Sequence, residues 1–142
     1  MTANEPGPCV SDHAARRILL AEDDAPLREL IATALRADGY AVVEAGDGLE
    51  LLAHVESALS AKDHGFDAWV IVADINMPGL TGLDVLAILR CAAVDAPVLL
   101  MTAFGDKETR LEAAELGAAA ILDKPFDLEC LRTALARVAA VS

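Results

Sequence analysis

The chain has 142 residues, a length that fits one domain with a full hydrophobic core. Its net charge of -12, from 23 acidic and 11 basic residues, disfavours direct contact with nucleic acid or with anionic lipid. The hydrophobic share of 55% excludes a chain that is disordered throughout, yet no apolar run reaches the roughly 18–20 residues that span a membrane. These properties predict a globular domain that lies neither in a membrane nor on DNA.

Two further features of the sequence are its N-terminal segment and its three cysteines. Residues 1–16 contain Pro6-Gly7-Pro8, no apolar core and no cleavage-like signal, so we expect a disordered tail before a domain that spans 17–142. The three cysteines are far apart, without a CxxC, which favours free thiols in a reducing cytoplasm. Cys91 and Cys130 lie within helical patterns, and we expect them to be small packing residues.

Short apolar runs alternate with helical periodicity along the domain. The run Ile18-Leu19-Leu20-Ala21 predicts a strand, and apolar residues at i, i+3, i+4, i+7 and i+8 from Leu27 predict an amphipathic helix. Pro26 fits the first turn of that helix, and Gly39 fits the position just after its end. Further strands are predicted at 40–45, 68–73, 97–101 and 119–122, and further helices at 48–62, 82–92, 107–116 and 127–138. Asp127 is the expected N-cap of the last helix.

This alternation makes five β–α units. Strands with nearly continuous apolar character indicate a parallel sheet that is covered by helices on both faces. Right-handed crossovers between such strands then give a doubly wound α/β fold, a (βα)5 sandwich of three layers.

The third predicted strand ends in a charged residue. The apolar run Val70-Ile71-Val72-Ala73 is followed at once by Asp74, and a turn with Pro78 and Gly79 comes next. Carboxyl ends of parallel strands are where open α/β sheets bind ligands. A charge directly after a buried strand costs free energy unless another group pairs with it, so Asp74 is a candidate functional residue.

Other strand ends carry side chains whose chemistry complements Asp74. Glu22 and Asp23 follow the first strand, Thr102 follows the fourth, and Lys124 follows the fifth. Three ionised carboxylates close together repel one another. Mg²⁺, which prefers oxygen ligands, relieves that repulsion. A lysine ammonium suits a phosphoryl oxygen, and a threonine hydroxyl donates to another. A carboxylate nucleophile with these partners describes phosphoryl transfer to an aspartate.

In these motifs the chain resembles a response regulator receiver domain, the phospho-accepting module of two-component signalling. The matching segments are Glu22-Asp23-Asp24, Asp74-Ile75-Asn76-Met77-Pro78-Gly79, Thr102-Ala103 and Lys124-Pro125-Phe126. The likeness covers about 17–139 and implies that 17–142 is a receiver domain. It implies a flavodoxin-like sheet with the strand order 2-1-3-4-5.

The resemblance also implies the metal ligands and the phosphoryl acceptor. Asp74 would accept the phosphoryl group. Asp23 would bind Mg²⁺ directly, Glu22 would hold it through water, and Asp74 and the backbone carbonyl of Asn76 would complete the protein ligands. Mn²⁺ is a possible substitute for Mg²⁺.

Three further expectations follow from the same resemblance. Thr102 would hydrogen-bond the phosphoryl group and shift toward it, and Lys124 would pair with it electrostatically. The bond between Lys124 and Pro125 would be a cis peptide. Asp24 lies one place beyond the matched acids and is expected to be a capping or solvated residue.

As a receiver the chain would be a signalling switch. Its only chemistry would be Mg²⁺-dependent self-phosphorylation from a phosphodonor and autodephosphorylation. A sensor histidine kinase, a phosphotransfer protein or a small phosphodonor would phosphorylate Asp74 in the cytoplasm. The new charge would bias the face made by residues 107–116, 119–122 and 127–138 toward a downstream target, an output domain or a homodimer, with no direct contact to nucleic acid or membrane.

The chain departs from the family pattern at several positions. Ile121 stands where receivers usually place Tyr or Phe, so we expect activation to move Thr102 while Ile121 repacks modestly. Asp123 precedes Lys124 and would either pair with a basic neighbour or face solvent. We also hypothesise that the bulky Phe104 shields the phospho-aspartate from water.

Three other functions fit the sequence less well. A haloacid-dehalogenase-like phosphatase needs a second acid two residues after its nucleophile, where this chain has Asn76, and it carries a cap insertion that this chain lacks. A nucleotide-binding domain needs a glycine-rich phosphate loop, and no G-x-G-x-x-G or GK[ST] follows any predicted strand. A phosphorylation-independent scaffold is disfavoured because every residue of the acceptor site is present.

Overall fold

The computed structural model describes residues 16–60, 69–103 and 105–141. The predicted N-terminal tail therefore lies outside the described residues, except for Arg16, and so does Phe104 with the shielding hypothesis attached to it.

Strands and helices alternate along this part of the chain, as the apolar pattern predicts. The strands are β1 (Arg17–Ala21), β2 (Ala41–Ala45), β3 (Trp69–Asp74), β4 (Val98–Thr102) and β5 (Ala120–Asp123). The helices are α2 (Ala25–Ala37), α3 (Gly48–Ser60), α4 (Gly82–Cys91), α5 (Lys107–Glu115) and α6 (Leu128–Val141). The predicted boundaries agree with these bounds to within a few residues, the usual uncertainty at helix and strand ends.

All strands pair in parallel in a single sheet with the order β2-β1-β3-β4-β5, which confirms the predicted flavodoxin-like topology. The register aligns Leu19 of β1 with Val43 of β2 and with Ile71 of β3. The chain order reverses between β1 and β3, because β2 lies on one side of β1 and β3 on the other. Ligands of open α/β sheets bind in the crevice at this point, beyond the carboxyl ends of the strands.

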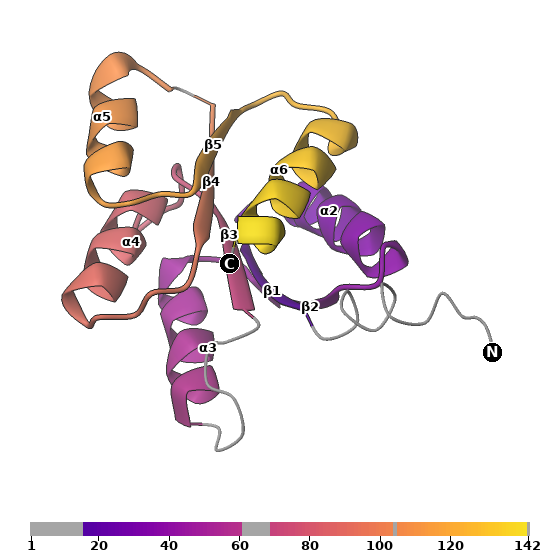
Figure 1. Ribbon diagram of the computed structural model, residues 1–142, viewed down its shortest axis with the longest axis horizontal. Coiled ribbons are helices and arrows are strands. Elements are labelled where there is room, and N and C mark those ends of the chain that lie inside the picture. Colours follow the sequence, from indigo (N-terminus) through magenta and orange to yellow (C-terminus); the bar gives the residue numbers. More distant parts are fainter. Residues whose placement is uncertain (1–15, 61–68, 104, 142) are drawn as a thin grey trace.

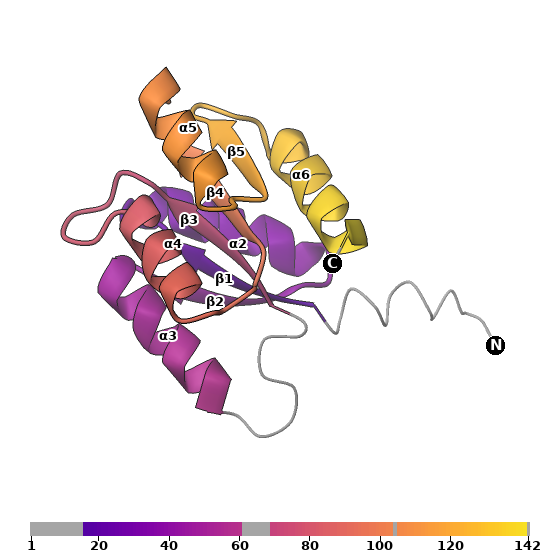
Figure 2. The ribbon, with the colours of Figure 1, turned by 60° about the vertical axis from the view of Figure 1, so that its left-hand side comes forward.

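Helices cover the sheet on both faces, and two hydrophobic clusters form the core. Figures 1 and 2 show α2 and α6 on one face of the sheet and α3, α4 and α5 on the other. Side chains of α2 and α6 pack with alternate residues of the central strands, and side chains of α3, α4 and α5 pack with the remaining ones. The three central strands are buried almost throughout, which explains why their sequences read as continuous apolar runs.

The helix ends follow the predicted signals. The Asp24 side chain accepts a hydrogen bond from the Leu27 backbone N–H at 3.2 Å, which makes Asp24 the N-cap of α2. Asp127 accepts one from the Cys130 N–H at 2.8 Å, as expected of a capping acid. Gly39 has a φ of 100°, the left-handed conformation that favours glycine just after a helix.

The expectation for the two described cysteines was wrong. Cys91 and Cys130 are both exposed free thiols. Helical geometry explains this for Cys130, because the inward face of α6 is taken by Leu131, Leu135 and Val138. Cys130 comes one residue before Leu131 and is rotated by about 100° from it.

No helix among the described residues is long and apolar enough to cross a membrane.

Candidate functional site

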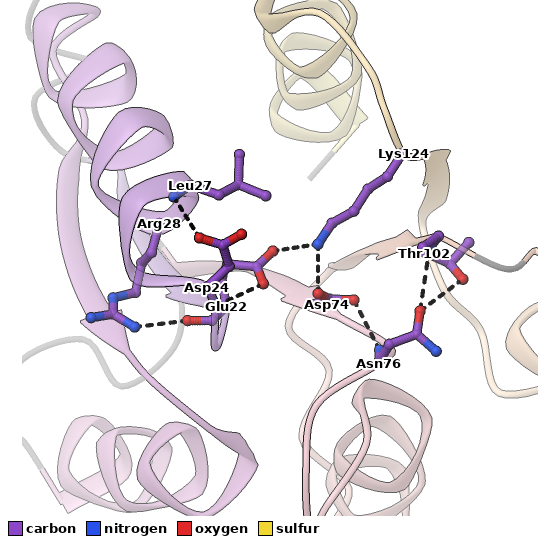
Figure 3. A network of polar contacts seen from close by, with 9 residues as sticks. Glu22, Asp24, Leu27, Arg28, Asp74, Asn76, Thr102 and Lys124 are labelled. Carbon is purple, nitrogen blue, oxygen red and sulfur yellow. Dashed lines mark hydrogen bonds and ion pairs between the residues drawn. The ribbon is translucent and has the colours of Figure 1, made fainter.

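Five side chains predicted to be functional lie at the carboxyl edge of the sheet. Asp74 is the last residue of β3 and Thr102 the last of β4, while Glu22 and Asp23 directly follow β1 and Lys124 directly follows β5. Figure 3 shows Glu22, Asp74, Thr102 and Lys124 gathered at this edge. We call these residues the strand-edge site. Parallel pairing brings them together, because every strand of the sheet ends on the same side.

Lys124 joins two acids of the site. Its Nζ lies 2.6 Å from Asp74 Oδ2 and 2.7 Å from Glu22 Oε1, and Figure 3 shows the lysine side chain reaching toward both carboxylates. Glu22 is 0% exposed and Asp74 is 2% exposed. The ammonium is the compensating charge that a buried carboxylate requires. The bond between Lys124 and Pro125 is cis, as the resemblance implies.

Burial and charge act in opposite directions on these groups. Burial raises the pKa of Glu22 to about 7, although the hydrogen bond from Lys124 pulls that pKa down. The nearby Asp74 carboxylate also raises the pKa of Glu22. For Lys124, burial lowers the pKa, but the hydrogen bonds to Asp74 and Glu22 outweigh it and leave the pKa above its usual value.

The acids form a cluster that suits a hard divalent cation. Carboxylate oxygens of Glu22, Asp23 and Asp74 all lie within 4.8 Å of one another, and Asp23 is exposed. Three carboxylates facing one ammonium leave an excess of negative charge, and oxygen atoms are the ligands that Mg²⁺ prefers. The exposed side at Asp23 leaves access for the several waters that Mg²⁺ usually retains. The donor set therefore fits Mg²⁺.

Asn76 organises the loop beyond β3 through its backbone and its side chain. Its N–H donates to Asp74 Oδ1 at 2.9 Å, so the backbone of Asn76 lies beside the acceptor carboxylate. Its side-chain Oδ1 accepts from the Thr102 hydroxyl at 3.3 Å and from the Ala103 N–H at 3.2 Å. Figure 3 shows these contacts linking the ends of β3 and β4. The link from the Asn76 side chain to Thr102 and Ala103 was not predicted from the sequence.

Arg28 is a second residue that the sequence argument missed. Its Nη1 donates to the backbone carbonyl of Glu22 at 2.8 Å, and its Nε lies 3.3 Å from Glu44 Oε1 on β2. Arg28 thus fixes the backbone that carries the acids after β1. The only signal in the sequence is an arginine in the second turn of the helix after the acids, which many surface helices also have.

Two residues just before Lys124, Asp123 and Ile121, are positions at which the sequence departs from the family pattern. Asp123 pairs with a basic neighbour, because Arg110 of α5 donates to both of its carboxylate oxygens. Ile121, two residues earlier on the same face of β5, is half-buried and packs against the hydrophobic cluster under α3, α4 and α5. The position usually held by an aromatic residue is therefore a packing position.

Comparison with known proteins agrees with this geometry. The family model of the response regulator receiver domain matches residues 18–136. Response regulator protein FleR of Pseudomonas aeruginosa is 37% identical over 126 residues, which cover 87% of this chain and 24% of FleR. The phosphate regulon transcriptional regulatory protein PhoB of Klebsiella pneumoniae is 36% identical over 131 residues, which cover 89% of this chain and 52% of PhoB. The chain thus spans about half or less of these two relatives.

Solved structures show the same likeness at the level of the fold. The chemotaxis protein CheY4 of Vibrio cholerae superposes with a TM-score of 0.75 at 33% identity, covering 87% of this chain and 98% of that one. Sequence, fold and the arrangement of acids, threonine and lysine agree. The chain belongs to the family of response regulator receiver domains, which are signalling modules of two-component systems and not classical enzymes.

Proposed function

We propose that Asp74 is the phosphoryl acceptor of this receiver domain. The observation that carries the proposal is the buried Asp74 carboxylate at the end of β3, held by Lys124 Nζ at 2.6 Å beside two further carboxylates. A buried carboxylate with a positive partner at an open strand edge is a nucleophile whose charge is compensated and whose direction is fixed.

The proposed reaction is the transfer of a phosphoryl group to a side-chain oxygen of Asp74. The oxygen attacks the phosphorus and forms an O–P bond, while the bond between the phosphorus and its donor breaks. The donor atom keeps the electron pair, so a phosphohistidine returns its imidazole and acetyl phosphate returns acetate. The product is an acyl phosphate, and attack by water on its phosphorus reverses the modification and releases inorganic phosphate.

The metal part of the proposal assigns ligands within this chain. Asp23, Asp74 and the backbone carbonyl of Asn76 would hold Mg²⁺, or Mn²⁺ in its place, with Glu22 acting through water. A bound divalent cation offsets the negative charge of the transferred group. The fit of the donor set supports this assignment, because its carboxylate oxygens already lie within 4.8 Å of one another.

Lys124 and Thr102 are the proposed sensors of the new group. Lys124 Nζ already contacts Asp74 Oδ2 and would pair with a phosphoryl oxygen added there. Thr102 is buried at the end of β4, with its hydroxyl directed to Asn76, and would turn its donor to the phosphoryl group. The haloacid-dehalogenase alternative gains nothing from the structure, because the side chain two residues after Asp74 is an amide that accepts from Thr102 and Ala103.

The proposed partners follow from this switch. A sensor histidine kinase or a phosphotransfer protein would supply the phosphoryl group in the cytoplasm, a setting that agrees with the free thiols of Cys91 and Cys130. The face made by α5, β5 and α6 would then bind a downstream target, an output domain or a second copy of the chain. Leu111 on α5, whose side chain is 56% exposed, would lie within such a contact. The net charge of -12 supports a function without direct nucleic-acid or membrane binding.

The test is phosphorylation by acetyl phosphate. We expect the wild type to gain the mass of one phosphoryl group in the presence of Mg²⁺ and to lose the reaction when the metal is chelated. Asp74→Asn should abolish the modification, because a neutral amide cannot attack phosphorus as a carboxylate does. Asp95→Asn, which changes an exposed acid between α4 and β4, is the matched control and should react like the wild type. A wild type that stays unmodified, or an Asp74→Asn variant that still reacts, would contradict the proposal.

A further inference from the structure

An ion pair outside the strand-edge site contacts the residues next to it. Arg110 of α5 donates from Nη2 to both carboxylate oxygens of Asp123, the last residue of β5. The Arg110 Nε donates to the backbone carbonyl of Gly105 at 3.1 Å. We call Arg110 with Asp123 the outer ion pair. It ties α5 to β5 and to the backbone that leads from β4 into α5.

Gly105 fits closely between the outer ion pair and Thr102. A Cβ atom at Gly105 would lie 2.7 Å from Asp123 Oδ1, 3.0 Å from Arg110 Nη2 and 3.0 Å from Thr102 Cγ2. The first separation is shorter than real Cβ atoms show, and the other two are tighter than most real Cβ contacts, so the space between the ion pair and the threonine methyl has no room for a side chain at Gly105. A displacement of Gly105 or of Thr102 would therefore disturb the outer ion pair.

The backbone of β5 strengthens this link. Thr102 is paired with Asp123 in the sheet register, and the Lys124 N–H donates to the Thr102 carbonyl at 2.7 Å. In this structure the Thr102 hydroxyl donates a hydrogen bond to Asn76, and the Asp74 carboxylate accepts one from Lys124. The outer ion pair thus lies next to Thr102. The Thr102 side chain must turn away from Asn76 before its hydroxyl can donate to a phosphoryl group on Asp74.

From these contacts we infer that Arg110 is a positioning residue, whose ion pair with Asp123 holds Gly105 against Thr102 and keeps the threonine hydroxyl on Asn76. The inference rests on the proposed function, because it concerns the response of the same site to a phosphoryl group. The outer ion pair thus stabilises the arrangement in which the Thr102 hydroxyl donates to Asn76. Charge on α5 and β5 therefore sets how strongly the strand-edge site responds.

This restraint has a measurable consequence for ligand affinity. A ligand that needs a turned Thr102 binds with an apparent affinity equal to its intrinsic affinity multiplied by the fraction of molecules in which the threonine has turned. Removing a restraint that favours the other arrangement raises that fraction. Because one exposed ion pair changes an equilibrium by up to about fivefold, its loss should tighten binding by about two- to fivefold.

The experiment measures the dissociation constant of beryllofluoride, a phosphoryl mimic, in excess Mg²⁺ by titration calorimetry. Arg110→Ala and Asp123→Asn should each bind the mimic about two- to fivefold more tightly than the wild type. The double variant should match Arg110→Ala, because without Arg110 the change at Asp123 has no ion pair left to remove. A single variant that binds like the wild type or more weakly overturns the inference, and so does a double variant in which the two gains multiply.

A matched control separates the local restraint from a general loss of stability. Arg132 of α6 pairs with Asp38 and with Glu129, away from Thr102, so Arg132→Ala should leave the affinity for the mimic unchanged. A gain in this control equal to that in Arg110→Ala overturns the inference. Failure of the wild type itself to bind the mimic would refute the proposed function and the inference with it. Normal binding by the wild type with no gain in Arg110→Ala refutes the inference alone.

Discussion

Two consecutive residues at the end of β5 make ion pairs in different surroundings. Lys124 turns toward the crevice and meets Glu22 and Asp74, and the Lys124 and Asp74 side chains are only 19% and 3% exposed. Asp123 turns toward α5 and meets Arg110, with side chains that are 60% and 41% exposed. We call the contacts of Lys124 the inner ion pairs, to distinguish them from the outer ion pair.

The difference shows how one strand end serves two purposes. Successive side chains of an extended segment point to opposite sides, so Asp123 and Lys124 reach different partners. The inner ion pairs are buried and have strong effects when one partner is removed, because the remaining charge is left uncompensated. The outer ion pair is exposed to solvent and contributes little to stability, which suits a restraint that must give way.

The largest effect is expected from breaking the inner ion pairs. Lys124→Met removes the positive charge from two buried carboxylates and from the proposed phosphoryl site. Since a hydrogen bond between charged groups contributes about 1.5–3 kcal/mol, the affinity for beryllofluoride should fall by about 10- to 100-fold. Titration calorimetry measures the change, with Lys107→Met, an exposed lysine of α5, as the control that should keep wild-type affinity. Wild-type affinity in Lys124→Met would remove this lysine from the phosphoryl site.

A smaller effect is expected when one inner acid is neutralised and the lysine is kept. Glu22→Gln leaves Lys124 paired with Asp74 and removes one carboxylate from the acidic cluster. Because groups that support a metal through water typically change metal affinity by 10- to 100-fold, we expect Mg²⁺ binding to weaken by about tenfold. Mg²⁺-dependent NMR shifts give the affinity, and Glu56→Gln on the exposed face of α3 is the matched control. Equal affinities in the two variants would mean that Glu22 takes no part in holding the metal.

The smallest effect concerns the stability that the outer ion pair provides. Arg110→Ala should change the free energy of unfolding by less than about 1 kcal/mol, since both partners are largely exposed. Leu135→Ala, which empties a buried position in α6, should cost about 2–5 kcal/mol by comparison. Urea denaturation measures both variants, and about 1 M salt should abolish the Arg110→Ala effect by screening. An Arg110→Ala cost as large as that of Leu135→Ala would show that the outer ion pair is a structural element.

Most of the fold could be predicted because local patterns and global topology agree in this chain. The buried strands β1, β3 and β4 read as continuous apolar runs, and capping residues such as Asp24 mark where helices begin. Parallel topology then places every strand end at one edge, so the strand-edge site could be assembled from residue types alone.

The contacts that could not be predicted from the sequence are those between a helix side chain and a strand end far away in the chain. Arg28 and Arg110 both lie on helices that cover the sheet, where an arginine usually faces solvent. Whether such a side chain reaches Glu22 or Asp123 depends on the rotation of its helix against the sheet, which is set by packing of the whole core. The same limit applies to Cys91 and Cys130, whose exposure depends on which face of the helix points inward.

The two surface thiols affect how self-association of this domain should be measured. Cys130 lies in the first turn of α6, on the face proposed for a homodimer, and its thiol is open to solvent. In air, exposed thiols of separate molecules oxidise to intermolecular disulfides. A covalent dimer of this origin would imitate one induced by phosphorylation. Light scattering on this protein therefore calls for excess reductant, and a dimer that survives under those conditions is held by noncovalent contacts.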